Sequence, residues 1–371
     1  MKFLIITHVP HIHLNNQYFA YAPYVREMNI WTKYVDEVAI VAPIVNREKS
    51  SIDTNYTHQN IQFKAIESFD LLNIKSIFFS FFKIPKICFT IFKAMKNADH
   101  IHLRCPGNVG LLGCFVQIFF PKKIKTAKYA GNWDANSKQP WSYKWQIWIL
   151  NNTFLTKNIK VLVYGEWENS SKNIKSFFTA SYSENEKISF QPKKWYQTCN
   201  FLFVGTLVKG KNPKYAILLI ENLIKSGFDV KLDFYGDGIL KNELQNYINQ
   251  NKLDNFIILN GNQSLQILKK AYQNNHFVVL PSESEGWPKA IAEGMFWSCV
   301  PISTRVSCVT NMLNDGKRGI FLTMNLEKDI SNIISVLENE NNFNQLSKAA
   351  FEWSNNYTNE AFETEIMKLL Q

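Results

Sequence analysis

Two glutamates in the stretch "PSESEGWPKAIAEGM", Glu285 and Glu293, are separated by seven residues and have the chemistry to bind hydroxyl groups. A loop rich in Ser and Gly precedes Pro288, and a helical run of small and apolar residues follows it. The free backbone N–H groups at the start of a helix attract anions such as a diphosphate. Carboxylates accept hydrogen bonds from paired hydroxyl groups, including those of ribose and hexoses. The stretch therefore predicts a site for a sugar linked to a diphosphate.

These residues also have a purely structural interpretation. Glu285 would then be an ordinary acid near a helix N-terminus, and Lys289 with Glu293 a surface pair that contributes about 0.3–0.5 kcal/mol. An isolated pair of glutamates at this spacing would favour that interpretation. The run "HFVVLP" before the stretch, however, is typical of a buried strand, and ligands of open parallel sheets bind beyond the carboxyl ends of such strands.

Alternating strand and helix patterns must position this stretch. The strand-like runs of the second half are "NFLFVGTL", "VKLDFYGDG", "FIILNG", "HFVVLP" and "CVPIST", with helical runs between them. The first half has a less regular series: "KFLIITH", "EVAIVAP", "ADHIHLRCP", "IKTAKYAG" and "IKVLVYG". Apolar strands that alternate with helices are typical of parallel sheets. We therefore predict an α/β fold with two Rossmann-like, doubly wound parallel-sheet domains, residues 1–195 and 196–350, and a helix within 351–371.

The composition is that of a globular protein. The 371 residues are enough for two domains, with 46% hydrophobic and 19% charged residues. The six cysteines are scattered without metal-ligand spacing, so we expect no disulfide framework, no zinc site and a cytoplasmic location. The apolar run in "MKFLIITH" is too short for a signal peptide. Lysines and Pro85 interrupt the apolar window 76–95, which argues against a membrane-spanning helix.

The excess of positive over negative charge lies in the first half. Residues 1–200 carry 25 Lys and Arg against 13 Asp and Glu, whereas residues 201–371 carry 16 against 18. The excess is concentrated in 72–96 and in "PKKIKTAK" at 121–128. A basic half predicts an anionic partner, and the alternative is a solvated surface with a composition biased towards lysine.

Three motifs in the second half, taken in order, resemble the retaining GT-B glycosyltransferases, specifically glycosyltransferase family 4. The motifs are "FVGTLVKGKNP", "DFYGDG" and "LPSESEGWPKAIAEGMFWSCVPIST", and the resemblance covers nearly all of 198–371. It implies a GT-B fold, with two Rossmann-like domains facing a cleft and a terminal helix packing back on the first domain. It also implies transfer of a hexose-type sugar, with retention, from a nucleoside-diphosphate sugar to a saccharide or lipid-linked saccharide in cell-surface polysaccharide or lipopolysaccharide synthesis.

The resemblance assigns roles to residues of the second half. Glu285 would contact the sugar hydroxyls, Glu293 would bind the ribose, and Lys211 would neutralise the leaving diphosphate. Thr206 stands where the family usually has an arginine, and either Lys209 or Arg305 could supply that charge. The remaining donor-binding residues that it implies are Gly205, Gly236, Gly238, Gly286, Trp287 and Pro288. It implies no metal and no cofactor beyond the nucleotide sugar as co-substrate.

Candidates in the first domain rest on weaker patterns. His8, His11 and His13 follow the first strand, and alternation favours His11 as a catalytic group and His13 on the acceptor side, although loop histidines with a structural role fit equally well. Further candidates follow later strands: Arg104 for an anionic group, Asn132 on the acceptor side, and Asp134 to orient an acceptor hydroxyl. Asn and Asp are also frequent turn residues. Trp167 is expected to pack in the core.

The Phe-rich, lysine-interrupted segment 72–96 suits an anionic bilayer, where a lipid-diphosphate-linked acceptor is presented. We therefore expect a peripheral protein on the inner face of the cytoplasmic membrane; core packing is the other explanation for the phenylalanines. Alternatives for the function are a GT-B epimerase or inverting transferase, and a binding module without turnover, which Thr206 would explain. A nucleic-acid-binding protein is disfavoured because the chain uses Lys and has few Arg.

Overall fold

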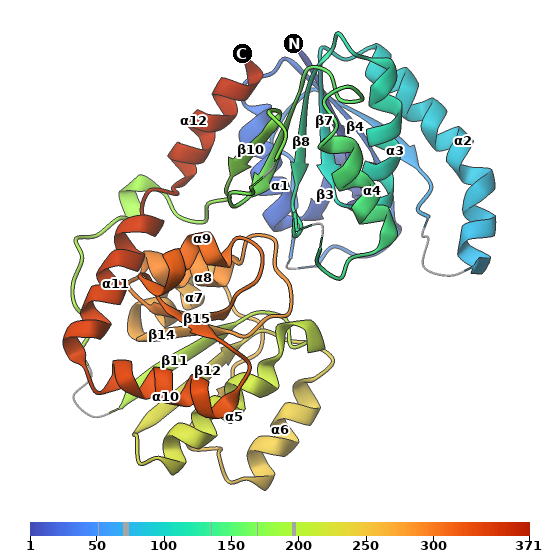
Figure 1. Ribbon diagram of the computed structural model, residues 1–371. Coiled ribbons are helices and arrows are strands. Elements are labelled where there is room, and N and C mark those ends of the chain that lie inside the picture. The colour runs from blue at the N-terminus through green and yellow to red at the C-terminus, as the bar shows by residue number, and fades with distance from the viewer. Residues whose placement is uncertain (51, 70–73, 135, 169, 195–197) are drawn as a thin grey trace. The chain divides into compact units, whose positions relative to one another are not determined.

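A computed structural model of residues 1–371 describes all of them except 51, 70–73, 135, 169 and 195–197, and except the side chains of 74–82. The chain forms two compact units (Figure 1). The first unit is Met1–Phe178 with Phe362–Gln371, and the second unit is Thr179–Ala361. The sequence predicts the boundary after residue 195, within the stretch 189–200, whose composition is typical of a linker.

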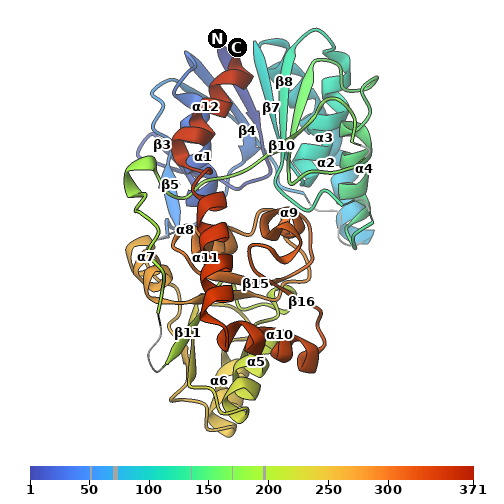
Figure 2. The ribbon, with the colours of Figure 1, turned by 60° about the vertical axis from the view of Figure 1, so that its left-hand side comes forward.

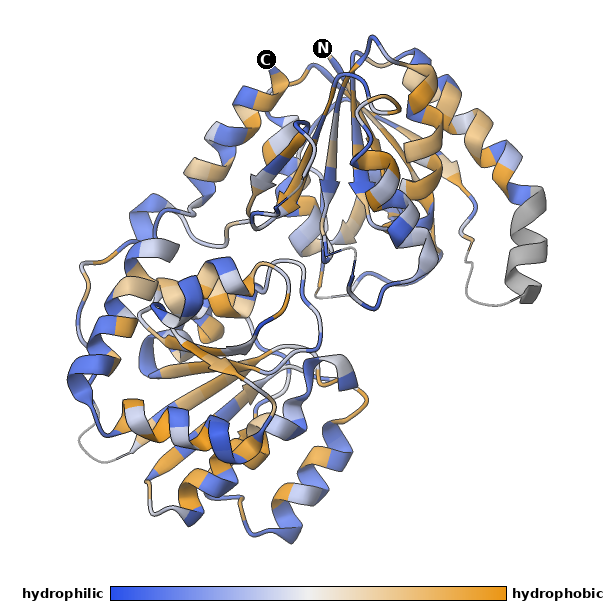
Figure 3. Cartoon of the chain, in the orientation of Figure 1, coloured by the Kyte–Doolittle hydropathy of each residue, from blue (hydrophilic) through white to orange (hydrophobic). Residues whose placement is uncertain are grey.

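The first unit is built on a seven-stranded sheet in the order β10-β9-β8-β7-β1-β4-β6, with every neighbouring pair parallel. The central strands are buried almost throughout, because helices cover both faces, and the polar side chains of His100, His102 and Arg104 are buried with them (Figure 3). The strands are β1 (Lys2–Ile6), β4 (Glu37–Pro43), β6 (Ile61–Ile66), β7 (His100–Cys105), β8 (Ile124–Tyr129), β9 (Ile159–Tyr164) and β10 (Ile174–Phe177).

Helices α2 (Ile74–Lys96), α3 (Asn108–Val116) and α4 (Trp141–Leu150) form one layer on this sheet, and the short helix η1 (Gln117–Phe119) follows α3. Helix α1 (Ala22–Thr32) and the end of α12 (Asn359–Leu370) lie on the other side of the sheet (Figures 1 and 2). No helix in the described part of the chain combines the length and the hydrophobicity needed to cross a bilayer.

A small antiparallel sheet of the first unit was not predicted. It pairs β2 (Ile12–Leu14) with β3 (Gln17–Tyr21), and β3 with β5 (Asp53–Asn55). Asn15 and Asn16 form the two-residue turn between β2 and β3, and both have a positive φ, 50° and 58°. Asn tolerates this left-handed conformation, which the tight turn of a hairpin requires.

The second unit is built on a six-stranded parallel sheet in the order β13-β12-β11-β14-β15-β16. Its strands are β11 (Cys199–Val204), β12 (Val230–Tyr235), β13 (Ile257–Leu259), β14 (Phe277–Leu280), β15 (Val300–Thr304) and β16 (Ile320–Leu322). Its helices are η2 (Glu184–Glu186), η3 (Lys209–Lys211), α5 (Pro213–Lys225), α6 (Lys241–Gln250), α7 (Leu265–Asn274), α8 (Lys289–Phe296), α9 (Val309–Leu313), η4 (Asn314–Gly316), α10 (Leu326–Leu337) and α11 (Glu340–Ser354). The predicted α/β class with two doubly wound parallel sheets is confirmed.

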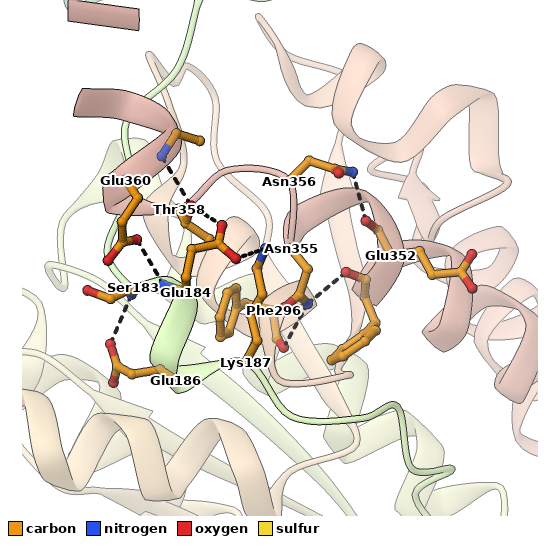
Figure 4. A network of polar contacts seen from close by, with 12 residues as sticks. Ser183, Glu184, Glu186, Lys187, Phe296, Glu352, Asn355, Asn356, Thr358 and Glu360 are labelled. Carbon is orange, nitrogen blue, oxygen red and sulfur yellow. Dashed lines mark hydrogen bonds and ion pairs between the residues drawn. The ribbon is translucent and has the colours of Figure 1, made fainter. Parts of the chain in front are cut away.

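Hydrogen bonds join the first residues of the second unit to its last residues. The Thr358 hydroxyl donates to Oε1 of Glu184 over 2.6 Å, and the Glu184 N–H donates to Oε2 of Glu360 over 2.8 Å (Figure 4). The N–H of Asn359 donates to the carbonyl of Tyr182 over 2.9 Å. The segment around η2, just after the start of the unit, is thus fixed to the turn that precedes α12.

Candidate functional site

The loop 281–288 follows the carboxyl end of β14, between the loops that follow β11 and β15. The N–H of Glu283 donates to the carbonyl of Gly210 over 2.9 Å, which joins the loop to η3 on one side. On the other side, the Thr304 hydroxyl donates to the carbonyl of Ser282 over 2.5 Å, and the Cys308 thiol to that of Gly286 over 2.9 Å. The backbone around the two glutamates is therefore held in place by both neighbours.

Glu285 and Lys211, 74 residues apart in sequence, form an ion pair in this loop. Nζ of Lys211 lies 2.5 Å from Oε1 of Glu285, and Glu285 is buried, with 8% of its surface exposed. A buried carboxylate needs a charged or hydrogen-bonding partner, and Lys211 supplies it. The structure thus brings together two residues that the sequence assigned separately to the sugar and to the diphosphate.

Glu293 projects from α8 towards the start of the second unit. The Ser181 hydroxyl donates to its Oε1 over 2.6 Å. Burial raises the pKa of Glu293 above its ordinary value, while the hydrogen bond from Ser181 and the charge of Lys289 act in the opposite direction. Burial and the charge of Glu293 in turn raise the pKa of Tyr182 and of Tyr272.

A cavity of about 20 Å³ lies beside Glu293, which is room for about one water molecule. A ribose does not fit this volume, so a ribose bound to this face of Glu293 would have to displace part of the lining. Apart from Glu293, the lining residues are Thr179, Ala180, Ser181, Tyr182, Trp287, Ala292, Phe296, Ser354 and Tyr357.

Trp287 holds the segment before α8 through its side chain. Its ring stacks near Trp353 of α11, with centroids 6.1 Å apart and planes at 24°, and meets Tyr357 edge-on at 5.6 Å. The resemblance assigned Trp287 to donor binding, and that role stays a prediction. Pro288 is the N-cap of α8 and not its first residue, so the helix begins at Lys289. The N–H of Ile291 donates to the carbonyl of Pro288 over 3.0 Å, so the N–H groups of α8 that lack an acceptor within the helix are those of Lys289 and Ala290.

The glycines of the two turns after β11 and β12 are explained by close backbone contact. A Cβ on Gly236, whose φ is 148°, would lie 1.9 Å from the carbonyl oxygen of Gly205, and a Cβ on Gly238 would lie 2.5 Å from that of Leu207. Two hydrogen bonds join these turns, from the N–H of Gly205 to Tyr235 and from the N–H of Leu207 to Asp237. Donor contacts of these glycines stay a prediction.

Two residues, Lys209 and Arg305, are candidates to supply the positive charge that Thr206 lacks. Thr206 and Lys209 are both exposed, and Lys209 lies two residues before Lys211 in the sequence. Arg305 is already engaged: its Nη1 lies 3.2 Å from Oδ1 of Asp315, and its guanidinium lies 3.8 Å from the centroid of the Phe321 ring.

His11, predicted as a catalytic group, is a core residue of the first unit. It is fully buried, with Nδ1 2.8 Å from the carbonyl of Val9 and Nε2 2.8 Å from the Tyr56 hydroxyl. Burial lowers the pKa of His11 to about 4, so the ring is neutral near pH 7. His13 is exposed and stacks on Tyr18 with ring centroids 4.7 Å apart, and its acceptor-side role stays a prediction.

Arg104, predicted to bind an anionic ligand group, has an anionic partner inside the first unit. It is buried and donates to both carboxylate oxygens of Glu27, over 2.5 and 3.2 Å. Lys128 lies 3.2 Å from the same carboxylate. Burial opposes ionisation of Glu27, but the charges of Arg104 and Lys128 lower its pKa to about 2. This buried cluster corrects the prediction.

Asn132 and Asp134 lie in a turn that follows β8. The side chain of Asn132 accepts from the N–H of Asp134 over 3.0 Å, and the side chain of Asp134 accepts from the N–H of Asn136 over 2.8 Å. These are the contacts that turn residues make, and the acceptor roles of both stay predictions. Trp167 packs against the core of the first unit, and its indole N–H donates to the carbonyl of Tyr164 over 2.8 Å.

Ser181 and Tyr182 beside Glu293 were not predicted, because they lie in an irregular segment more than 100 residues away with no motif of its own. Among the described residues, no group of three or more His, Cys, Asp or Glu side chains is placed to hold a metal ion.

Comparison with known proteins bears on this site. Residues 183–353 match the family model described as "Glycosyl transferases group 1". A protein of Methanocaldococcus jannaschii named "Uncharacterized glycosyltransferase MJ1178" is 30% identical over 158 residues, which are 42% of this chain and only 43% of that relative.

Two solved structures show the fold. That of the lipopolysaccharide outer core galactosyltransferase WaaB superposes with a TM-score of 0.71 at 16% identity, covering 100% of this chain and 99% of that one. That of Anabaena Alr3699/HepE with UDP and glucose gives 0.66 at 13% identity, covering 100% and 99%. The fold is GT-B, and together the comparisons support a glycosyltransferase.

Proposed function

We propose that this protein is a retaining glycosyltransferase that moves a hexose-type sugar from a nucleoside-diphosphate sugar to a saccharide or lipid-linked saccharide during synthesis of a cell-surface glycan. The observation that carries the proposal is the ion pair of Lys211 and Glu285 in the loop after β14. It stands in the segment that matches a glycosyltransferase family, and beyond the carboxyl ends of parallel strands, where such sheets bind ligands.

The chemistry explains why a lysine and a carboxylate belong together here. Breaking the bond from the anomeric carbon to the diphosphate leaves negative charge on phosphate and positive charge on the carbon. Lys211 and the N–H groups at the start of α8 stabilise the first, and Glu285 orients the sugar hydroxyls and favours the second. The acceptor oxygen bonds to the anomeric carbon on the face that the phosphate leaves, and its proton passes to that phosphate. No metal or further cofactor takes part in this scheme.

Glu293 binds the ribose in this proposal. Ser181 already donates to this carboxylate, so a ribose hydroxyl either takes the other lone pairs of Glu293 or replaces the serine hydroxyl. The donor then contacts the segment through which the chain enters the second unit. Of the two sources for a second cation, Lys209 lies two residues before Lys211 in the same short helix, whereas Arg305 would first have to leave Asp315.

The first experiment is a screen of nucleotide sugars by thermal shift, since a ligand that binds only the folded state raises its melting temperature. The sugar that gives the largest shift is then incubated with acceptor candidates, and NMR of the product gives its anomeric configuration. We expect the configuration of the donor to be retained. Inversion would indicate another type of GT-B enzyme, and a thermal shift without release of nucleoside diphosphate would indicate a binding module without turnover.

We also propose that the protein works at the inner face of the cytoplasmic membrane, because a lipid-linked acceptor is presented there. The basic character of the first half supports this location. Part of the segment first considered for it, residues 70–82, lies outside the described side chains.

A further inference from the structure

Among the described residues, the exposed phenylalanines and tryptophans lie in one stretch of the chain, 89–154. Every largely exposed Phe or Trp among the described residues comes from α2, η1, α4 or the turn after α4. Their exposed fractions reach 73% for Phe119 and 78% for Phe154. The set, which we call the aromatic face, is Phe89, Phe92, Phe119, Trp141, Trp145, Trp148 and Phe154.

Helix α4 is turned so that its tryptophans point outward. Trp141, Trp145 and Trp148 follow the i, i+4, i+7 spacing of one helix face, and each exposes at least 51% of its surface. Ser142 and Gln146 are buried instead, and the Gln146 side chain accepts from the N–H of Gly107 over 3.3 Å. A helix on the surface of a protein in water usually buries Trp and exposes Ser and Gln. Helix α4 does the reverse, so its exposed side is suited to contact with another molecule.

The stretch of chain that carries this face is strongly basic, although three of its cations, Arg104, Lys125 and Lys128, are buried. Residues 71–165 contain 14 Lys and Arg against 2 Asp and Glu, a net charge of +12 that equals the excess of the first 200 residues. Exposed lysines come from the same elements as the aromatic side chains: Lys86, Lys93 and Lys96 on α2, Lys144 on α4 and Lys157 after it. Nζ of Lys157 lies 5.5 Å from the centroid of the Phe154 ring.

Helices α2, α3 and α4 lie side by side on the same side of the first sheet (Figures 1 and 2). Ring contacts connect the members of the aromatic face to this layer: Phe92 lies 6.3 Å from Phe119, and Trp145 lies 6.1 Å from Phe115 of α3. The described part of α2 carries both hydrophobic and hydrophilic residues (Figure 3).

We propose that the aromatic face and its lysines are the surface by which this protein docks on an anionic bilayer. Tryptophan is stable at the level of lipid headgroups, because its ring is apolar and its N–H is polar. Lysines near the surface add electrostatic attraction to anionic lipids. A nucleic acid is the weaker candidate, because the charge comes from Lys and the one Arg of 71–165, Arg104, is buried on Glu27.

This docking surface deepens the membrane part of the proposed function but needs neither donor nor acceptor. The test is sedimentation of the full chain with vesicles of 30% phosphatidylglycerol in phosphatidylcholine, compared with phosphatidylcholine alone. Wild type is expected to bind the anionic vesicles, with a blue shift of its tryptophan emission. The double variant Trp145→Ala/Trp148→Ala should lose at least tenfold in affinity while its melting temperature stays unchanged, since both side chains are exposed.

A matched control replaces two exposed apolar residues of the second unit, Ile239→Ala/Leu265→Ala, which should bind vesicles as wild type does. A charge reversal, Lys93→Glu/Lys144→Glu, should lower the binding to anionic vesicles and remove its dependence on salt. The proposal is overturned if wild type does not bind the anionic vesicles, if the tryptophan variant binds them equally well, or if the protein binds single-stranded RNA in place of vesicles. If the vesicle test fails, the proposed transfer reaction is still tested separately, by the release of nucleoside diphosphate.

Discussion

At the scale of single residues, Lys211 and Glu285 have two functions in the proposed site. Without a ligand, each neutralises the other over 2.5 Å. With a donor bound, Lys211 gains the diphosphate as a second anionic partner and Glu285 gains the sugar hydroxyls. The ion pair thus holds both side chains in position before the substrate arrives, which lowers the cost of ordering them.

Replacement of Lys211 by alanine should affect chemistry more than folding. Loss of one charge that stabilises the leaving diphosphate is expected to lower kcat about 10²–10³-fold. The Glu285 carboxylate loses its charged partner, which should lower the free energy of unfolding by about 1.5–3 kcal/mol. Steady-state kinetics and urea unfolding measure both. Lys231→Ala, an exposed lysine near the start of β12, should change neither, and an active Lys211→Ala enzyme would refute the role.

Glu293 should make nucleotide binding depend on pH. Its pKa is raised by burial, so folding favours the protonated carboxyl. That contribution to stability is fully present below the ordinary pKa of about 4.3 and is lost as the pH rises through the raised value. Ribose hydroxyls need the ionised form as acceptor. The affinity for a nucleoside diphosphate should therefore fall as the pH is lowered through the raised pKa.

Calorimetric titration at a series of pH values, with the nucleoside diphosphate that gives the largest thermal shift, measures this dependence. Glu293→Gln should bind more weakly and with little change between these pH values. Glu283→Gln, an exposed residue of the neighbouring loop, should keep the wild-type profile. The same pH profile for Glu293→Gln and wild type would exclude Glu293 as the titrating group.

At the scale of elements, the turns after β11 and β12 position η3 and therefore Lys211. Gly236→Ala would place a Cβ 1.9 Å from the carbonyl oxygen of Gly205 and force these turns apart. We expect a loss of about 1–3 kcal/mol in stability, together with weaker nucleotide binding. Thermal unfolding and calorimetry test this. Gly210→Ala is the control, because a Cβ there meets no atom within 4 Å; equal effects of the two substitutions would contradict the explanation.

Regular elements were the part of the structure that the sequence predicted best. Strands such as β14 are continuous apolar runs that end at Pro or Gly, and helices such as α5 begin at Pro and end before Gly227, so local signals mark both ends. The hairpin of β2 and β3 was missed although its Asn-Asn turn is such a signal. Helix α4 was missed as well, because it has apolar residues on both its exposed and its buried faces and so lacks the usual amphipathic pattern.

The sequence predicted those residues of the candidate site that belong to recognisable motifs. Glu285 and Lys211 belong to two motifs of known order, so their meeting could be expected. The contact of Ser181 with Glu293 could not, since it depends on how the chain enters the second unit. Burial misled the histidine prediction: the alternation that pointed to His11 does not tell whether a side chain reaches solvent or the core.

At the scale of the whole molecule, the last helix of the chain packs in the first unit, which otherwise consists of Met1–Phe178. The part of α12 from Phe362 onward belongs to the first unit, where the ring of Phe362 is 2% exposed and lies 5.4 Å from that of Phe177. Nζ of the buried Lys128 lies 4.9 Å from the same ring. Removal of the Phe362 ring would leave a cavity beside the buried ammonium group of Lys128.

Phe362→Ala should therefore lower the free energy of unfolding by about 3–5 kcal/mol. Urea unfolding followed by circular dichroism is the measurement. Met367→Ala changes an exposed residue of the same helix and should stay within about 0.5 kcal/mol of wild type. Equal stability of Phe362→Ala and wild type would mean that the helix is not docked as the structure shows.

The most direct test of the proposed function compares two glutamates of one loop. Release of nucleoside diphosphate from the donor is measured for wild type, Glu285→Gln and Glu283→Gln under the same conditions. We predict that wild type and Glu283→Gln turn over at similar rates, whereas Glu285→Gln is slower by about 10²-fold or more although it is folded. Wild-type activity of Glu285→Gln, or no turnover by wild type with any nucleotide sugar, would contradict the site proposed here.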